Sequence, residues 1–208
     1  MKTFYTLLTT ILLSVTLAFG ASTQAEAAST HTVSSGDTMW KIAVRYQVGV
    51  TEIIDANPQL SNPNLIYPGQ TLNIPGQSTN NRSMEQQVVS LVNEERAKHG
   101  LQPLKENWEL SRVARFKSED MSDRNYFSHT SPTYGSPHQM IRDFGLTYRA
   151  SGENIAAGQT SAQSVFNSWM NSSGHRQNIL SSNYTEIGVG YADGGSYGHY
   201  WTQMFISK

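Results

Sequence analysis

The residues of this sequence that could do chemistry are serine, histidine and carboxylate side chains, because the chain contains no cysteine. Ser172 and His175 are three residues apart, a spacing that brings a hydroxyl and an imidazole together on one helix face. With Glu153 they supply the residue types of a serine protease, although nothing in the sequence marks an oxyanion hole. Glu153 has no evident second carboxylate for glycoside hydrolysis, and no His-Glu-x-x-His zinc motif occurs. The catalytic candidates are therefore Glu153, His175 and Ser172, and the sequence favours a binding protein over an enzyme.

Composition and the N-terminus limit where such a site operates. The chain has 208 residues, a formal charge of −1 and a pI near 6.6, so no nucleic-acid partner is expected. An uncharged apolar run from Phe4 to Phe19 precedes Ala25-Glu26-Ala27, the small-x-small pattern of a cleavage site. We expect residues 1–27 to be a signal peptide. The alternative is a membrane anchor, but a spanning helix needs about 20 apolar residues, so we expect no stable membrane span after cleavage.

Two domains are predicted from periodicity and turn residues. Residues 28–75 are expected to form a small βααβ domain of strand, helix, helix and strand. The side chains expected to pack in its core are Trp40, Ile54, Leu65 and Leu72. Residues 76–83 contain nothing to bury and are typical of a flexible linker. Ser83 and Gln86 make a capping box, so the second domain is expected to occupy residues 84–208.

The second domain is expected to place helices before strands. Apolar residues with helical spacing follow Ser83, Trp108 and Ser136, and they recur from Ala162 to Trp169. From Ile187 onward the period changes to two, which predicts an antiparallel hairpin. This order of elements predicts an α+β domain in which helices cover a sheet.

Two stretches of the first domain carry a recognisable pattern. Residues 33–43 read Val-Ser-Ser-Gly-Asp-Thr-Met-Trp-Lys-Ile-Ala, and residues 66–75 read Ile-Tyr-Pro-Gly-Gln-Thr-Leu-Asn-Ile-Pro. Together they resemble the LysM family, which implies a domain that binds N-acetylglucosamine of peptidoglycan or chitin-like glycans. The residues implied for glycan binding are Gly36, Asp37, Thr38, Asn64, Leu65 and Ile66. The alternative is that Asp37 and Thr38 serve only to cap a helix.

Four pieces of the second domain occur in an order typical of another family. They are Phe127-Ser128-His129, Gly152-Glu153-Asn154-Ile155, residues 169–180 and residues 200–205. Together they resemble the bacterial branch of the CAP (SCP-like) superfamily, which includes cysteine-rich secretory proteins, antigen 5 and pathogenesis-related proteins. The resemblance implies a three-layer α/β/α sandwich with an antiparallel sheet. It also implies a groove in which two histidines and two glutamates converge and, in many members, hold a divalent metal.

The resemblance assigns His129 to the first histidine of that group and Glu153 to the first glutamate. The position of the second glutamate holds Ser172, so the group is incomplete, and His175 could supply the missing polar side chain. The last histidine falls on His199 only if the strand contains a bulge; otherwise the neighbouring tyrosine takes that place. The implied metal ligands are His129, Glu153 and His175, with His199 in reserve, a set that could hold Zn²⁺. The alternative is that Glu153 and His175 only tie a loop and a helix to the sheet.

These patterns predict a secreted protein of the cell wall or spore envelope. The first domain would bind the glycan, and the second would engage an unidentified ligand, with either a divalent metal such as zinc or no cofactor. The alternatives are a peptidoglycan hydrolase, a protease, or a structural protein of the spore coat. The last rests on residues 40–46 and 66–70, which are similar to those of spore-coat assembly proteins.

Overall fold

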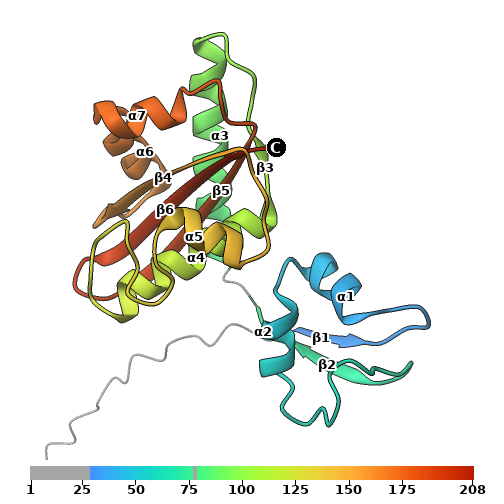
Figure 1. The fold of residues 1–208 in the computed structure, drawn as a ribbon. Coiled ribbons are helices and arrows are strands. Elements are labelled where there is room, and N and C mark those ends of the chain that lie inside the picture. Colours follow the sequence, from blue (N-terminus) through green and yellow to red (C-terminus); the bar gives the residue numbers. More distant parts are fainter. Residues whose placement is uncertain (1–28, 77–78) are drawn as a thin grey trace, which may run out of the picture.

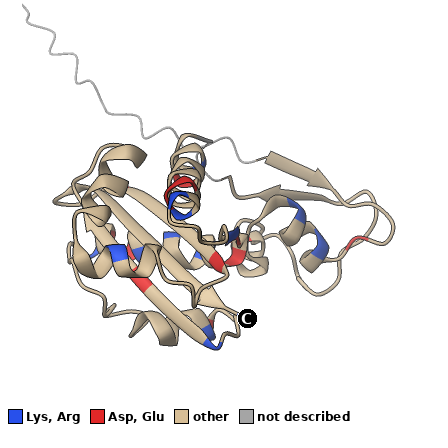
Figure 2. Cartoon of the chain, turned by 90° about the horizontal axis from the view of Figure 1, so that it is seen from above, with Lys and Arg blue, Asp and Glu red and all other residues tan. Residues whose placement is uncertain are grey.

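The computed structural model describes residues 29–76 and 79–208, which form two domains (Figure 1). The predicted signal peptide, residues 1–27, lies outside the described residues. Across the part that is described, none of the helices combines the length and the apolar character needed to span a bilayer. Basic and acidic residues are interspersed in both domains (Figure 2).

The N-terminal domain has the predicted βααβ order. Its elements are β1 (Ser29–Thr32), α1 (Met39–Tyr46), α2 (Val50–Asp55) and β2 (Thr71–Ile74). The two strands pair antiparallel, with Ser29 opposite Ile74. Thr38 begins α1, because its hydroxyl accepts a hydrogen bond from the N–H of Lys41 at 3.2 Å. The helices pack over this two-stranded sheet and enclose a small apolar core.

The core of this domain differs from the predicted one at two positions. Helix α1 buries Met39, Ile42 and Ala43, which follow the i, i+3, i+4 spacing of one face. Trp40 lies on the outer face and is 58% exposed, and Leu65 is 50% exposed. The predicted packing of Trp40 and Leu65 is therefore wrong, whereas Leu72 is fully buried and Ile54 packs against the core.

The C-terminal domain places helices on both faces of a four-stranded sheet (Figure 1). Its elements are α3 (Thr79–Lys98), β3 (Lys105–Glu106), α4 (Trp108–Asp123), α5 (Pro137–Asp143), β4 (Ala150–Ala157), α6 (Ala162–Met170), α7 (Ser173–Ile179), β5 (Glu186–Gly194) and β6 (Gly198–Ser207). The strand order is β3-β5-β6-β4, and all neighbours are antiparallel except the short β3, which runs parallel to β5. The α+β class and the helix–sheet–helix layers are as predicted.

The boundary between the domains is shorter than predicted. Helix α3 begins at Thr79, so most of the predicted flexible linker, residues 76–83, is helical. The polar residues before Ser83 form one more turn of the amphipathic helix, so the helix does not begin at the predicted capping box. Of the predicted linker, only residues 77–78 lie outside the described residues.

Strands β4 and β6 send alternate side chains into two different layers. The register pairs Glu153 with Met204 and Asn154 with Gln203. Glu153 and Met204 face the layer of α4 and α5, whose core includes Met204. Asn154 and Gln203 face the layer of α3, α6 and α7, whose core includes Phe205, two residues after Gln203. Adjacent residues of β4 therefore belong to opposite sides of the sheet.

Helix α4 lies unusually close to β5. A Cβ atom on Gly188 would be 2.3 Å from the carbonyl carbon of Leu110, and one on Gly190 would be 2.1 Å from the backbone nitrogen of Arg115. Glycine is the only residue that permits this approach. The close packing fixes α4 and the charged side chains that it carries beneath the loop that follows it.

Candidate functional site

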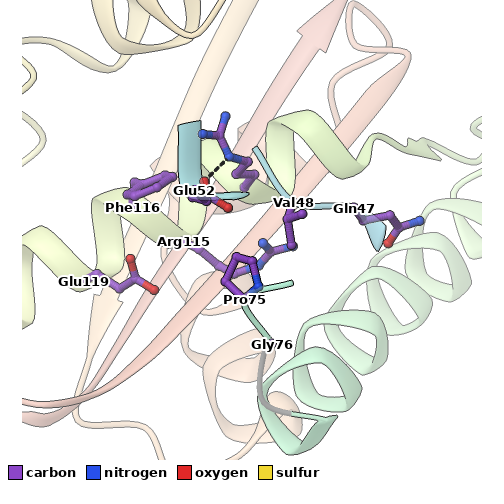
Figure 3. Close-up of a pocket in the computed structure, with 9 residues that line it drawn as sticks. Gln47, Val48, Glu52, Pro75, Gly76, Arg115, Phe116 and Glu119 are labelled. Atoms are coloured by element: carbon purple, nitrogen blue, oxygen red, sulfur yellow. Dashed lines mark hydrogen bonds and ion pairs between the residues drawn. The ribbon is translucent and has the colours of Figure 1, made fainter. Parts of the chain in front are cut away.

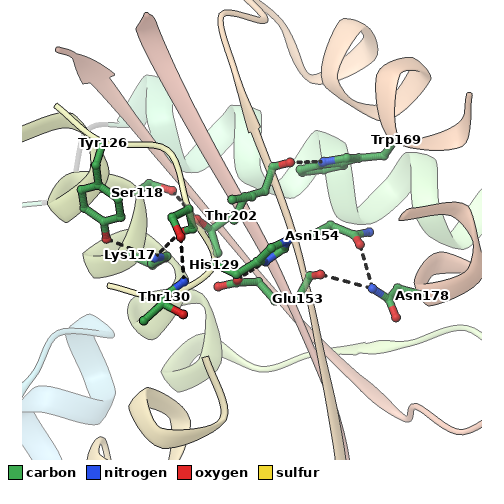
Figure 4. A network of polar contacts seen from close by, with 12 residues as sticks. Lys117, Ser118, Tyr126, His129, Thr130, Glu153, Asn154, Trp169, Asn178 and Thr202 are labelled. Carbon is green, nitrogen blue, oxygen red and sulfur yellow. Dashed lines mark hydrogen bonds and ion pairs between the residues drawn. The ribbon is translucent and has the colours of Figure 1, made fainter. Parts of the chain in front are cut away.

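His129 and Glu153 form a hydrogen-bonded pair at the edge of the sheet. His129 lies in the loop between α4 and α5, and Glu153 lies on the edge strand β4. The Nδ1 atom of His129 is 2.6 Å from Oε1 of Glu153 (Figure 4). The Glu153 side chain is only 3% exposed, whereas that of His129 is 55% exposed. The pair therefore presents an accessible imidazole above a buried carboxylate.

The second oxygen of this carboxylate is buried. Among the described residues, Oε2 of Glu153 accepts no hydrogen bond. A buried, unsatisfied carboxylate oxygen is costly, so its persistence calls for an explanation, such as a functional role or a bound water or ion. The Oε2 atom is therefore the position where a hydrogen-bond donor or a cation of a ligand would be stabilised.

A buried lysine supports the loop that carries His129. Lys117 of α4 is 1% exposed. Its Nζ donates to the backbone oxygen of Ser128 at 2.7 Å and to the hydroxyl of Tyr126 at 3.0 Å, and it lies 4.8 Å from the centre of the tyrosine ring. Lys117 thus fixes the residue immediately before His129 and places a positive charge beneath the site (Figure 4).

One carboxylate of α4 holds both ends of the same loop. Asp120 accepts hydrogen bonds from the hydroxyls of Tyr126 at 2.5 Å, Ser131 at 2.7 Å and Thr133 at 2.5 Å. The Nε atom of Arg124 lies 3.1 Å from the same carboxylate. Because the tyrosine precedes His129 and the other two hydroxyls follow it, Asp120 closes the loop around the histidine.

Sequence reasoning missed Lys117 and Asp120. Charged residues on a helix are usually assigned to solvent, and neither belongs to a catalytic motif. Their position on α4 could have identified them, because both fall within the apolar stripe formed by Val113, Ala114 and Met121. Two opposite charges inside a buried stripe indicate a buried polar network.

The two imidazoles near the edge strand have opposite protonation tendencies. The hydrogen bond to Glu153 raises the pKa of His129 above 6.5, although burial and the charge of Lys117 act in the opposite direction. Burial lowers the pKa of His175 below 6.5, and the positive charge of His129 lowers it further. Burial also lowers the pKa of Lys117, against the attraction of Glu153 and Asp120. Near pH 6.5 the site therefore favours one protonated and one neutral imidazole.

His175 reaches the sheet through its backbone. The Nδ2 atom of Asn154 donates to the His175 carbonyl oxygen at 3.1 Å and to Oε1 of Gln203 at 2.9 Å. Asn178, one turn further along α7, donates to Oδ1 of Asn154 at 2.8 Å and to the carbonyl oxygen of Glu153 at 3.2 Å. These contacts pin α7 to the sheet, which is the structural role that the sequence left open for this motif.

The other two candidates do not join the pair. The backbone of Ser172 begins α7, and its carbonyl oxygen accepts from the N–H of Arg176. The carboxylate of Glu153 is bonded to His129, so the predicted triad with Ser172 and His175 is not formed. His199 lies 2.6 Å from the hydroxyl of Tyr191. It lies on the face of β6 opposite to Glu153, because the register runs through the strand without a bulge.

The loops predicted to bind glycan are partly committed to internal contacts. Asp37 accepts from Nε2 of His31 at 2.8 Å and from the N–H of Ser34 at 2.9 Å, and its side chain is 8% exposed. Thr38 caps α1. Gly36 adopts a φ of +86°, a conformation that favours glycine. The loop therefore offers backbone groups, and the residues around the half-exposed Leu65 offer the apolar surface.

Family comparisons agree with both domains. A model of the cysteine-rich secretory protein family (CAP) matches residues 89–205, more than half of the chain. This chain belongs to the CAP family. A model of the LysM domain matches residues 31–75, so the LysM domain precedes the CAP domain, in the predicted order.

Relatives match parts of this architecture. Uncharacterized protein YkwD of Bacillus subtilis is 56% identical over 124 residues, which cover 60% of this chain and 47% of that protein. N-acetylmuramoyl-L-alanine amidase sle1 of Staphylococcus epidermidis is 36% identical over 85 residues, 41% of this chain and 26% of that protein. The crystal structure of an extracellular protein containing an SCP domain from Bacillus anthracis has a TM-score of 0.57 and 34% identity, covering 68% of this chain and 47% of that one. The chain thus spans about half or less of the length of these proteins.

The CAP site departs from the set of metal ligands that the resemblance implied. In residues 29–76 and 79–208, no three His, Asp or Glu side chains lie close enough together to hold a metal ion. His129 and Glu153 share a hydrogen bond, whereas the hydrogen bond described for His175 is made by its backbone oxygen with Asn154, and His199 lies on the opposite face of β6. The described residues therefore do not bring His129, Glu153 and His175 together as one three-ligand metal site.

Proposed function

We propose that this chain is a secreted, cell-wall-associated binding protein. Its LysM domain binds N-acetylglucosamine in peptidoglycan or a chitin-like glycan, and its CAP domain engages a second ligand at His129 and Glu153. The observation that carries the proposal is the buried Oε2 atom of Glu153, which lacks a partner among the described residues and lies beneath an exposed imidazole. A donor group of a ligand would satisfy that oxygen.

Two observations support the glycan partner. The LysM turn at Gly36 is held rigid by Asp37, so its backbone groups are already positioned for a ligand. The amidase relative bears a name that refers to N-acetylmuramoyl groups, which are constituents of peptidoglycan. A shallow site of backbone groups beside apolar surface suits N-acetyl sugars, because it matches the amide and the methyl group together.

Retention on purified peptidoglycan tests the glycan partner. Leu65→Asn places a polar side chain in the predicted loop, and we expect it to reduce the retained fraction several-fold. Val44→Asn is the matched control, because Val44 is also an exposed apolar residue of the LysM domain but lies outside the two loops. Equal retention of both variants and the wild type would contradict the assignment of these loops.

Among the described residues, the second buried carboxylate near Glu153 is already occupied. Asp120, the buried carboxylate that shares Lys117 with Glu153, already accepts from three hydroxyls and pairs with Arg124. It therefore has no free oxygen for acid–base chemistry across a glycosidic bond. We expect no dye release from labelled peptidoglycan. Release that Glu153→Gln abolishes would instead establish the hydrolase alternative.

A divalent metal cofactor stays a prediction, and the structure offers fewer ligands for it than the sequence suggested. Because Nδ1 of His129 is hydrogen-bonded to Glu153, the imidazole can offer a metal only its Nε2 atom, and this single ligand falls short of a three-ligand zinc site. Metal analysis of the purified chain against His129→Ala tests it. Equal zinc content in both proteins would discard this pair as a metal site.

A further inference from the structure

An ion pair of Arg112 joins the CAP domain to the LysM domain. Arg112 of α4 forms an ion pair with Glu52 of α2 through its Nε atom. Its guanidinium lies 5.1 Å from the ring centre of Phe116 and 5.3 Å from that of Phe144. The side chains of Arg112 and Glu52 are 19% and 27% exposed, so each is largely covered. The arginine is thus oriented by two aromatic rings of the CAP domain before it meets the LysM domain.

A glycine of the LysM domain fits this contact. Gly49 begins α2 with a φ of −76°, a conformation open to any residue. A Cβ atom there would lie 2.1 Å from Nη2 of Arg112. The backbone of the LysM domain therefore does not require glycine at this position, and a larger residue there would require the flexible guanidinium of Arg112 to move. Gly49, Glu52 and Arg112 form what we call the seam.

A second contact and a short connection strengthen the seam. Gln47 accepts a hydrogen bond from Arg82 of α3 through its side-chain oxygen. Because α3 begins at Thr79, two residues separate Gly76 of the LysM side from the first helix of the CAP domain. A connection this short gives an effective concentration on the order of millimolar or more, so a modest contact suffices to hold the domains together.

The seam is polar and incompletely packed. Beside the ion pair lies a cavity of ≈ 220 Å³ lined by Val48, Pro75, Arg115, Phe116 and Glu119, among others (Figure 3). Attraction between charges at such a partly hydrated contact is weakened by salt. The contact therefore depends on electrostatics, unlike the sealed apolar core of a single domain.

We propose that the LysM and CAP domains dock as one body, with the ion pair between Glu52 and Arg112 as the principal contact. The docking residues of the LysM domain lie at Gln47, Gly49 and Glu52, separate from the predicted glycan loops at residues 36–38 and 64–66. Figure 1 shows α2 on the side of the LysM domain that faces the CAP domain. Glycan binding and docking are compatible, and docking sets a fixed orientation of the CAP site relative to the bound glycan strand.

Distance measurement between spin labels tests the docking. The chain has no cysteine, so Ser61→Cys in the LysM domain and Gln163→Cys in α6 give a clean pair of labelling sites. Arg112→Glu reverses the charge at the seam. Glu52→Gln removes the charge but keeps an acceptor for the N–H of Gly49, which Glu52 caps at 2.9 Å. Arg149→Glu and Glu94→Gln make the same charge changes at exposed positions outside the seam.

Docking predicts one narrow distance distribution in the wild type and in both controls. We expect Arg112→Glu to broaden it several-fold and Glu52→Gln to broaden it by less. Relaxation of backbone ¹⁵N nuclei gives a second measurement, in which docked domains share one rotational correlation time and the LysM domain of Arg112→Glu tumbles faster. A dispersed NMR spectrum of Arg112→Glu also shows that each domain of the variant is folded. If Arg112→Glu does not fold, the distance distribution of Glu52→Gln tests the docking instead. A wild-type distribution as broad as that of the seam variant overturns the proposal.

Discussion

Asp120→Ala is expected to loosen the loop around His129 and destabilise the CAP domain. The substitution removes the acceptor of the hydroxyls of Tyr126, Ser131 and Thr133. Ser131 is buried and Tyr126 is partly buried, so their hydroxyls lose a charged acceptor without full replacement by water. Thr133 is exposed and can bond to solvent.

The magnitude follows from these two hydroxyls. A hydrogen bond to a charged group contributes about 1.5–2 kcal/mol, so the loss of two costs roughly 3–4 kcal/mol. Arg124 adds little, because its side chain is 57% exposed and surface ion pairs are weak. With a urea dependence of about 2 kcal/mol per molar, the unfolding midpoint should fall by roughly 1.5–2 M.

Urea unfolding at neutral pH measures the effect, with Asp123→Ala as the control. Asp123 is an exposed carboxylate of the same helix, so its removal changes the charge equally. Burial would raise the pKa of Asp120, but the hydroxyls of Thr133, Tyr126 and Ser131 hold it below the ordinary 3.8. Its stabilisation is therefore complete above pH 3.8 and is lost as the pH falls through the lower folded value, so variant and wild type should converge in strong acid. A midpoint for Asp120→Ala within experimental error of the Asp123→Ala control would refute this account of the loop.

Three further outcomes are expected. In an NMR titration, the pKa of His129 should lie above 6.5 and the pKa of His175 below it, and the reverse order would contradict the assigned contacts. Because its pKa is raised in the folded state, His129 adds stability that is full below pH 6.5 and is lost as the pH rises through the higher folded pKa. Gly190→Ala should cost about 3 kcal/mol in urea unfolding, since its Cβ would meet the backbone of α4, whereas Gly174→Ala, with open space around it, should be neutral or stabilising; equal stability of the two would argue against the close helix packing. Arg96→Met should lower the free energy of unfolding by about 3 kcal/mol, because the buried guanidinium donates to three backbone carbonyls. A loss below about 1 kcal/mol would mean that water replaces the guanidinium as the donor.

Much of the fold could be predicted from periodicity. The apolar spacing of α4, α5 and α6 and the alternation of β5 and β6 gave the right element types and the right layers, because each element buries one regular face. The predicted end of the linker was too late, because α3 already begins at Thr79. Polar residues carry little signal of where an exposed first turn begins. Trp40 and Leu65 were misplaced for a related reason: a large apolar side chain is assigned to the core by default, and only the phase of α1 reveals that Trp40 faces outward.

Only part of the candidate site could be predicted from the sequence. The motifs placed His129 and Glu153 together, but the alternation of β4 puts Glu153 and Asn154 on opposite faces, and it is Asn154 that bonds the backbone of His175. His31 is only 7% exposed, because Asp37 and Tyr46 bind its ring nitrogens. Such pairings join residues of different elements, and no local pattern encodes them.

The edge strand β4 has one more consequence, for how the protein behaves at high concentration. An open strand edge exposes carbonyl oxygens on which another chain can start a continuous sheet. The carbonyls of Glu153 and Ile155 are two residues apart and so point toward the same edge, and they already accept hydrogen bonds from Asn178 and from the indole nitrogen of Trp169. Helices α6 and α7 thereby shield the strand that carries the carboxylate, which guards against self-association and fibril growth along that rim.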